Sequence, residues 1–411
     1  MCGAQPQLAG PHFFLGILAF RENDTAQAEK HLQQAAAIDS TNPQIQLHLG
    51  YVYYARGEYV SAIDRFEKTI AVDENNEDAW YHVSKAYSQE SRRYFEEVQR
   101  KHPDSYYTHL ARAHFYEAKA SWQDAIEEYR KAGEQQPEPA LKARVDWLGL
   151  RAAGQDPPFV PAGEDIDGST VFLHNKPPFS EISALNRKWR EIAGAGAPAD
   201  PMPPRTLYRK AEAYQLLSYM ASMWVYANAP DSYRAYQLKG QSLEAAGRTD
   251  EAIVEYRKAL EKNPQLRSVH FAIGNLYWRN SSFDEALAEL QAELKLNPND
   301  ADSHYELGDI LFTQSKLDEA ADHFLTCLRY APDTVEAHLA LERIYSSKGQ
   351  PDKAVRHLND AARIAPTEAT PHYRLWLLYR KEGKTAEAER ERQLFQKLKT
   401  ASEPRLNHAE K

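Results

Sequence analysis

The chain has 411 residues, of which 42% are hydrophobic, 27% charged and 11% aromatic, a composition typical of a globular protein and not of a disordered one. Its formal net charge is −9 and no Lys/Arg-rich block stands out, so we expect no nucleic-acid partner, because phosphate backbones attract cationic surfaces. The two cysteines, Cys2 and Cys327, are too few for a disulfide framework.

An apolar run near the N-terminus, Phe13 to Phe20, has no basic segment before it and no small-residue cleavage site after it. It is also far shorter than the ~20 residues that span a bilayer. We therefore expect a buried helix there, with no signal peptide and no membrane span. A cytoplasmic location follows by default, and the protein would be exported if its true start lay upstream.

Similar blocks of sequence follow one another in the N-terminal part of the chain, residues 1–154. The third block is irregular, because its expected second helix, Ser91 to Lys101, is short and aromatic. The fourth runs from Tyr106 to Pro137. The first two blocks share a Leu-Gly pair, then an Ala, then a large apolar residue: Leu15-Gly16, Ala28 and Leu32, and Leu49-Gly50, Ala62 and Phe66.

Residues 155–204 lie outside this pattern and are rich in Pro and Gly. One helix is expected within them, Ser180 to Ala193, with Ser180 as its N-cap. We interpret the segment as a surface insert or linker. The alternative is a regulatory segment, in which the apolar Val171-Phe172-Leu173 docks into a groove of the protein and competes with its ligand.

After the insert, a 34-residue period is clearest from Arg267 onward. The small residues of each block allow two helices to approach closely, and the Pro ends the second helix. Three successive blocks carry these slots: Ile273-Gly274, Ala286, Leu290 and Pro298; Leu307-Gly308, Ala320, Phe324 and Pro332; and Leu341, Ala354, Leu358 and Pro366.

This order of slots resembles the tetratricopeptide repeat (TPR) family. The resemblance implies an all-α fold, a right-handed superhelical solenoid built of helix pairs. We expect one array in residues 1–154, the insert in 155–204, and a second array in 205–400, made of an irregular helix pair and about five repeats. Residues 401–411 are expected to be a disordered tail.

The two arrays are themselves related. The segment Tyr81 to Pro137 matches Tyr208 to Pro264 without a gap, so that Tyr81 aligns with Tyr208 and Pro137 with Pro264. The irregular third repeat therefore has a twin at the start of the second array. This arrangement resembles that of some bacterial, notably acidobacterial, TPR proteins.

A search for catalytic or metal-binding patterns predicts no enzyme, no metal and no cofactor. No Walker A, His-Glu-x-x-His or Gly-x-Ser-x-Gly motif is present. Cys327 occupies a small packing slot. Six histidines share one slot, the fourth residue of a first helix, at spacings too long to hold one ion, so we predict structural roles for them: His12, His109, His270, His304, His338 and His372.

In the TPR family the first helices line a concave groove with their second, fifth, ninth and twelfth residues. In the N-terminal array these positions are Phe13, Ile17, Phe20, Leu47, Tyr51, Tyr54, Tyr81 and Lys85. In the C-terminal array they include Gln237 and Gln241 and the nine residues that we select as the candidate peptide-binding groove: Phe271, Asn275, Trp278, Tyr305, Asp309, Phe312, Arg343, Tyr373 and Arg380.

The function implied is that of a scaffold that binds a peptide or partner protein in this groove, through aromatic burial and directed hydrogen bonds. Some of the rings could instead only pack between neighbouring helices. The chaperone-carboxylate mode of the family is disfavoured, because Phe271 stands where that mode needs Lys and Asp309 would repel a carboxylate. The alternative function is an accessory subunit of a bacterial envelope or secretion system that acts through the insert or the convex face.

Overall fold

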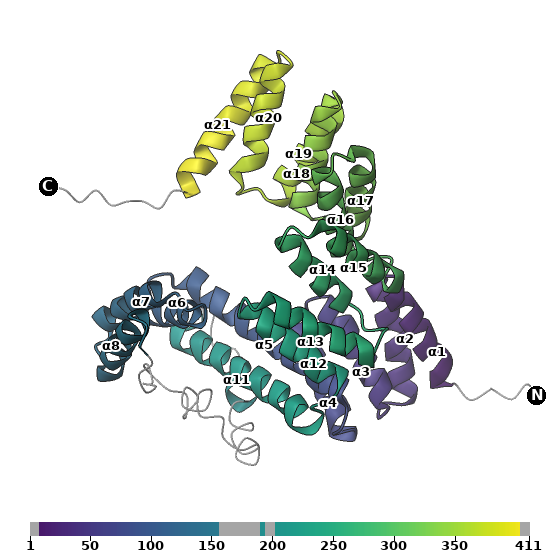
Figure 1. Cartoon of the computed structure of the whole chain (residues 1–411), viewed down its shortest axis with the longest axis vertical. Helices are drawn as coiled ribbons and strands as arrows, with labels where there is room; N and C mark the ends of the chain where they lie inside the picture. Colours follow the sequence, from purple (N-terminus) through teal and green to yellow (C-terminus); the bar gives the residue numbers. More distant parts are fainter. Residues whose placement is uncertain (1–7, 156–189, 194–201, 403–411) are drawn as a thin grey trace, which may run out of the picture. The chain divides into compact units, whose positions relative to one another are not determined.

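The structure is a computed structural model, and it describes residues 8–155, 190–193 and 202–402 (Figure 1). These residues form helices and no strands, which confirms the all-α prediction. The apolar segment Val171-Phe172-Leu173 lies outside the described residues, and so does the expected helix Ser180–Ala193 except for residues 190–193, which are helical. The chain divides into two compact units, Met1–Lys262 and Asn263–Lys411.

Unit 1 consists mainly of antiparallel helix pairs joined by short turns. We call the first helix of each pair the A helix and the second the B helix. The described helices of unit 1 are α1 (Ala9–Arg21), α2 (Thr25–Ile38), α3 (Pro43–Ala55), α4 (Tyr59–Val72), α5 (Glu77–Lys101), α6 (Tyr106–Ala118), α7 (Trp122–Gln135), α8 (Pro139–Ala152), α11 (Pro204–Asn228), α12 (Tyr233–Ala245) and α13 (Thr249–Lys262).

Unit 2 contains four consecutive A/B pairs. Its helices are α14 (Val269–Arg279), α15 (Phe283–Leu296), α16 (Ala301–Thr313), α17 (Leu317–Tyr330), α18 (Val335–Ser347), α19 (Pro351–Ile364), α20 (Ala369–Lys381) and α21 (Thr385–Ser402).

The apolar run near the N-terminus is helical, as predicted, but it is not buried. It lies in α1, where Phe14 is 65% exposed and Leu18 is 53% exposed. Gly16 is the buried residue of this helix. Since α1 packs mainly against α2, only one side of the helix is covered.

The turn between the A and B helices has a fixed backbone geometry. A residue with positive φ follows the A helices of the regular repeats, because the left-handed conformation ends a helix and satisfies its last carbonyls. Within each run these residues recur every 34 positions: Asn23 and Gly57; Ala120 and Gly154; and Gly247, Ser281, Ser315, Gly349 and Gly383.

The glycines inside the A helices allow the close approach that the sequence predicted. A Cβ atom at Gly308 would lie 2.9 Å from the ring of Phe324, and one at Gly274 would lie 3.0 Å from Leu290. Real Cβ atoms are rarely that close to a neighbour, so these positions favour glycine over any larger residue.

The prediction of a helix pair in the irregular repeats is wrong. The 34-residue period places a turn at Ser91, but α5 continues through this residue as one helix of 25 residues. Ser218, the counterpart of Ser91 in the second copy, likewise lies inside the 25-residue helix α11. Neither helix contains Gly or Pro near these serines, so nothing in the local sequence ends the helix.

Helices α5 and α11 pack against each other as an antiparallel pair (Figure 1). Trp80, early in α5, stacks on Trp224, late in α11, with ring centroids 4.9 Å apart and an interplanar angle of 14°. Near the middle, Tyr94 stacks on Tyr214 at 5.8 Å. This pairing holds α11, α12 and α13 in unit 1, so the unit boundary at 262/263 falls inside the array that the periodicity delimits as 205–400.

Candidate functional site

In unit 1, two of the predicted groove positions are covered by another helix of the same unit. Tyr81 of α5 is only 5% exposed, and its hydroxyl accepts a hydrogen bond of 2.8 Å from Nε2 of Gln241 on α12. The ammonium of Lys85 donates to Oε1 of Gln241 at 3.2 Å. Arg234 of α12 completes the contact by donating to Asp78 at 2.7 Å. The lining positions of α5 and α12 therefore bind each other.

Tyr51, another predicted lining residue of unit 1, also packs inside the unit. Its ring meets the imidazole of His82 edge-on, with centroids 4.6 Å apart, and lies 5.8 Å from the ring of Phe66. It therefore serves the contact between consecutive A helices, which is the packing role that the sequence left open for such rings.

In unit 2, the candidate residues of α14, α16 and α18 contact the next A helix in a repeating pattern. The indole Nε1 of Trp278 donates to Oδ2 of Asp309 at 3.1 Å. The guanidinium of Arg343 lies over the ring of Phe312, 4.4 Å from its centroid. Asn275 donates from its side-chain amide to Oε1 of Glu306. In each pair the partners are 31 positions apart, and we call this series of contacts the A-helix ladder.

The aromatic candidates on α14 and α16 are neither free nor fully buried. Phe271 and Trp278 pack beside a cluster that includes the buried Leu290 and Leu307. Tyr305 lies 5.6 Å from the ring of Phe324, with its own side chain still partly exposed. These rings therefore contribute to the core and keep an exposed edge on the A-helix face.

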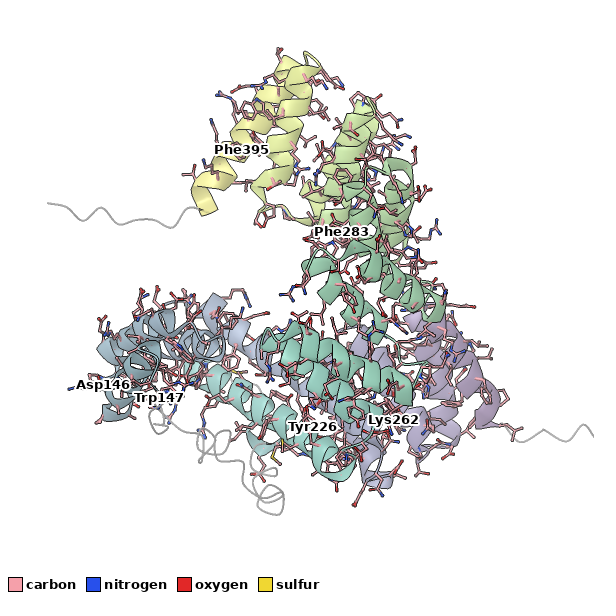
Figure 2. All side chains as sticks on the ribbon, in the orientation of Figure 1. Asp146, Trp147, Tyr226, Lys262, Phe283 and Phe395 are labelled. Carbon is pink, nitrogen blue, oxygen red and sulfur yellow. The ribbon has the colours of Figure 1, made fainter. Side chains whose placement is uncertain are left out.

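The last two candidates belong to a separate aromatic cluster on α20 and α21. Tyr373 is 40% exposed and lies 5.8 Å from Trp376 and 5.2 Å from Phe395, which Figure 2 labels. The guanidinium of Arg380 lies 5.3 Å from the ring centroid of Trp376. The sequence analysis missed Trp376 and Phe395, although Trp376 stands two repeats after Gly308, in the slot where Gly was expected.

A group of carboxylates lies along α16 and at the start of α18. We call it the acidic cluster, and it consists of Asp300, Asp302, Glu306, Asp309 and Glu336. Glu306 is only 7% exposed, and its Oε2 atom is buried without a hydrogen-bond partner. The pKa of the Glu306 carboxyl is raised to about 7, mainly by burial and also by the charges of Asp302, Asp300 and Asp309, while the hydrogen bond from Asn275 lowers it.

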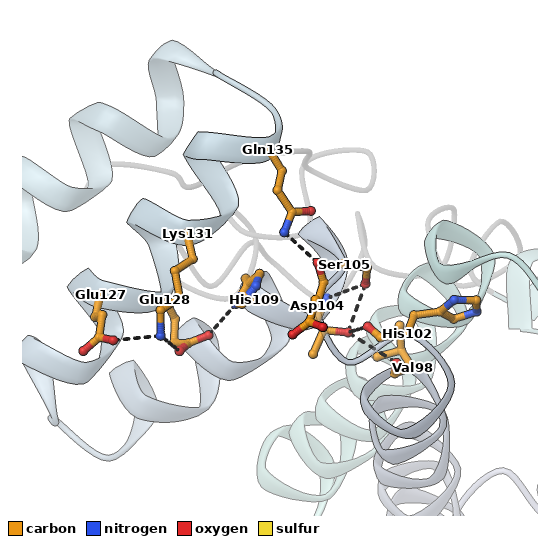
Figure 3. Close-up of polar contacts among 10 residues, drawn as sticks. Val98, His102, Asp104, Ser105, His109, Glu127, Glu128, Lys131 and Gln135 are labelled. Carbon is orange, nitrogen blue, oxygen red and sulfur yellow. Dashed lines mark hydrogen bonds and ion pairs between the residues drawn. The ribbon is translucent and has the colours of Figure 1, made fainter. Parts of the chain in front are cut away.

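The histidines that share one slot each contact a B-helix residue 19 positions later. Figure 3 shows the pair of His109 and Glu128, with 2.7 Å between Nδ1 and Oε2. The structural role predicted for these histidines agrees with the contacts, but the sequence analysis missed the partners, which the constant spacing of 19 could have revealed. The remaining pairs are His12 with His31, His270 with Glu289, His304 with His323, His338 with His357, and His372 with Glu391.

Cys327 is 1% exposed, and burial raises the pKa of its thiol to about 11, so the reactive thiolate is disfavoured there. Within residues 8–155, 190–193 and 202–402, no group of three or more His, Cys, Asp or Glu side chains is placed to hold a metal ion. In the same ranges, no helix has the length and apolarity that crossing a membrane requires.

Family models described as tetratricopeptide repeat match residues 19–87, 271–333 and 337–371, and one described as TPR repeat matches residues 240–281. Among solved structures, the crystal structure of MamA is 22% identical, covers 39% of this chain and 95% of its own, and has a TM-score of 0.38. YrrB, titled a TPR protein with an unusual peptide-binding site, is 17% identical. The match covers 44% of this chain and 94% of YrrB, with a TM-score of 0.39. PilF of Pseudomonas aeruginosa is 22% identical, and the match covers 40% of this chain and 75% of PilF, with a TM-score of 0.37.

Proposed function

The chain is a tetratricopeptide repeat protein, and from this premise we propose that it is an interaction scaffold whose unit 2 binds an extended segment of a partner protein. The proposed binding surface is the A-helix face of α14, α16 and α18. Repeat arrays present such continuous faces, because each repeat contacts only its neighbours and the exposed stripe extends along the whole series.

The observation that carries the proposal is the A-helix ladder. Trp278 is oriented by its hydrogen bond to Asp309, and Phe312 is held against the guanidinium of Arg343. Both rings keep part of their surface exposed. Aromatic and Arg side chains dominate binding energy at protein interfaces, and side chains that are already fixed lose less entropy when a ligand binds.

The state of unit 1 supports the choice of unit 2. There, Tyr81 and Lys85 are already engaged by Gln241 of α12, so a ligand would have to displace an internal contact. In unit 2, Trp278 and Phe312 also contact the next A helix, but both rings stay partly exposed, whereas Tyr81 is only 5% exposed.

The experiment is a crosslinking pull-down from the native organism with the full chain and a Trp278→Ala/Phe312→Ala double variant. We expect the double variant to lose at least about 90% of a specifically recovered partner, since truncation of interface aromatics costs about 2 kcal/mol or more. Phe115→Ala is the matched control, because Phe115 is an aromatic of α6 in unit 1 with 53% exposure. Unchanged recovery in the double variant, with helical content intact, would contradict the proposal.

A further inference from the structure

We propose that the partner segment presents a cationic side chain, Lys or Arg, to the acidic cluster of unit 2. This inference rests on the proposed function and specifies its ligand. The site would be centred on the carboxylate of Asp309, next to the rings of Trp278, Tyr305 and Phe312, and Asp302 would add negative charge about two turns away on α16.

The first observation is uncompensated charge. In the described part of the chain, none of the five carboxylates of the acidic cluster takes part in an ion pair. The nearest cation of the ladder, Arg343 on α18, lies over the ring of Phe312. Like charges held together without a counter-ion destabilise a fold, so a cation that the chain itself does not supply would bind there favourably.

The second observation concerns the buried member of the acidic cluster, Glu306, whose Oε1 accepts a hydrogen bond from Asn275. Glu306 is more than nine-tenths buried, and its Oε2 carries no hydrogen bond. A buried carboxylate oxygen without a hydrogen-bond partner disfavours the charged form of the group, so a nearby cation would stabilise it. A ligand cation at either Asp302 or Asp309 would lower the free energy of the ionised Glu306, which lies about one turn from each of them on α16.

The surroundings distinguish between kinds of cation. No group of three ligands suited to a metal ion is present among the described residues, which disfavours a bare divalent cation. Partly exposed rings instead favour an organic cation, because ammonium and guanidinium groups bind over aromatic faces while their aliphatic stems cover apolar surface. Arg343 over Phe312 already shows this contact within the chain.

The test measures the binding of three fluorescein-labelled decapeptides to the full chain by anisotropy. The peptides share one tyrosine and a glutamine-serine background and carry three Lys, three Glu or three Gln. The variant is Asp302→Asn/Asp309→Asn, in which the new amide at position 309 still offers an oxygen to Trp278. The control is Asp284→Asn/Asp322→Asn, which changes the formal charge equally on the B helices α15 and α17.

We expect the Lys peptide to bind at least about tenfold more tightly than the Glu peptide. Its Kd should rise at least about fivefold in Asp302→Asn/Asp309→Asn, in line with two lost charge pairs, and less than about 1.5-fold in the control. Equal binding of the three peptides, or equal loss in the control, would overturn the inference.

A second variant, Glu306→Gln, separates a binding role from a structural one. We expect it to raise the melting temperature, because it removes a charge from the acidic cluster, and to weaken binding of the Lys peptide by about twofold or more. A lower melting temperature with unchanged binding would overturn the inference. If charge selectivity is absent but Trp278→Ala/Phe312→Ala still abolishes partner recovery, the inference fails and the proposed function stands.

Discussion

Tyr87 and Tyr214 are equivalent residues of the two matching segments Tyr81 to Pro137 and Tyr208 to Pro264. Their ring centroids lie 6.1 Å apart, between α5 and α11. Contacts around them repeat in both directions. Tyr81 of α5 bonds to Gln241 of α12 at 2.8 Å, and its counterpart Tyr208 of α11 bonds to His114 of α6 at 3.2 Å. Such reciprocal contacts are those of a twofold-symmetric dimer interface, here contained within one chain.

This interface should contribute strongly to the stability of unit 1. Tyr214 is 7% exposed and stacks on Tyr94, so Tyr214→Ala leaves a cavity on the local symmetry axis. We expect a loss of about 3–5 kcal/mol in the free energy of unfolding, measured by urea denaturation. Tyr236→Ala, which removes a partly exposed Tyr of α12, should cost less than about 1 kcal/mol. Similar losses for the two variants would show that the α5/α11 contact is energetically unimportant.

The sequence predicted the regular repeat units well because their slots encode local packing. Gly308 meets the ring of Phe324 across one turn, and Gly50 meets the ring of Phe66 in the same way. The pairing of α5 with α11 was not predicted, because a match between two distant segments shows that they are related but not that they touch. The missing turn at Ser91 was predictable in principle from the absence of Gly and Pro, but the strong period suggested otherwise.

The candidate site was predicted in part. All nine selected residues lie on A helices, since the periodicity fixes the face of a helix. Their partners were not predicted, because a contact such as Trp278 with Asp309 depends on the stagger between two helices. The covering of Tyr81 by α12 depends on tertiary packing, which a repeat pattern does not specify. That the nine residues bind a peptide stays a prediction.

Replacing a serine by glycine should have opposite effects on stability at a left-handed turn and inside a helix. Ser281 has a φ of 61°, which costs a side-chain-bearing residue about 1 kcal/mol, so Ser281→Gly should stabilise unit 2 by about 0.5–1 kcal/mol. Ser91, where the 34-residue period expects the same turn, lies inside α5, so Ser91→Gly should destabilise unit 1 by a similar amount. Differential scanning calorimetry measures both, and effects of equal sign would contradict the assignment of these turns.

A pair of glycines tests the helix packing. At Gly308 a methyl group would overlap the Phe324 ring, so we expect Gly308→Ala to cost about 1–3 kcal/mol. At Gly133 of α7 nothing lies within 4 Å of the new Cβ, so Gly133→Ala should stabilise by about 0.5–1 kcal/mol through helix propensity. Chemical denaturation of the two variants provides the comparison. A neutral Gly308→Ala would mean that α16 and α17 separate easily.

Paired histidines make the stability of unit 2 depend on pH. Nδ1 of His338 and Nδ1 of His357 lie 3.0 Å apart, and Nε2 of His338 lies 3.3 Å from the carbonyl of Pro332. Burial, and to a lesser extent the neighbouring His338, lowers the pKa of His357 to about 4. In the unfolded chain its pKa is about 6.5, so between these values the unfolded chain binds a proton that the folded chain does not. Stability should therefore fall as the pH decreases through this window.

Glu306 has the opposite effect on the pH dependence of stability. Its pKa is about 7 in the folded chain and about 4.5 in the unfolded chain, so between these values only the folded chain keeps the proton, and stability rises as the pH decreases. A comparison with His357→Gln isolates the histidine, since Gln still donates a hydrogen bond to His338. Between pH 7 and pH 5 we expect the melting temperature of the wild type to fall about 2–4 °C more than that of the variant, which is about 1 kcal/mol after a discount for partial exposure. In the control His372→Gln, whose histidine pairs with Glu391, the wild-type dependence should persist. Parallel curves for the wild type and His357→Gln would show that the folded pair accepts a proton as readily as the unfolded chain.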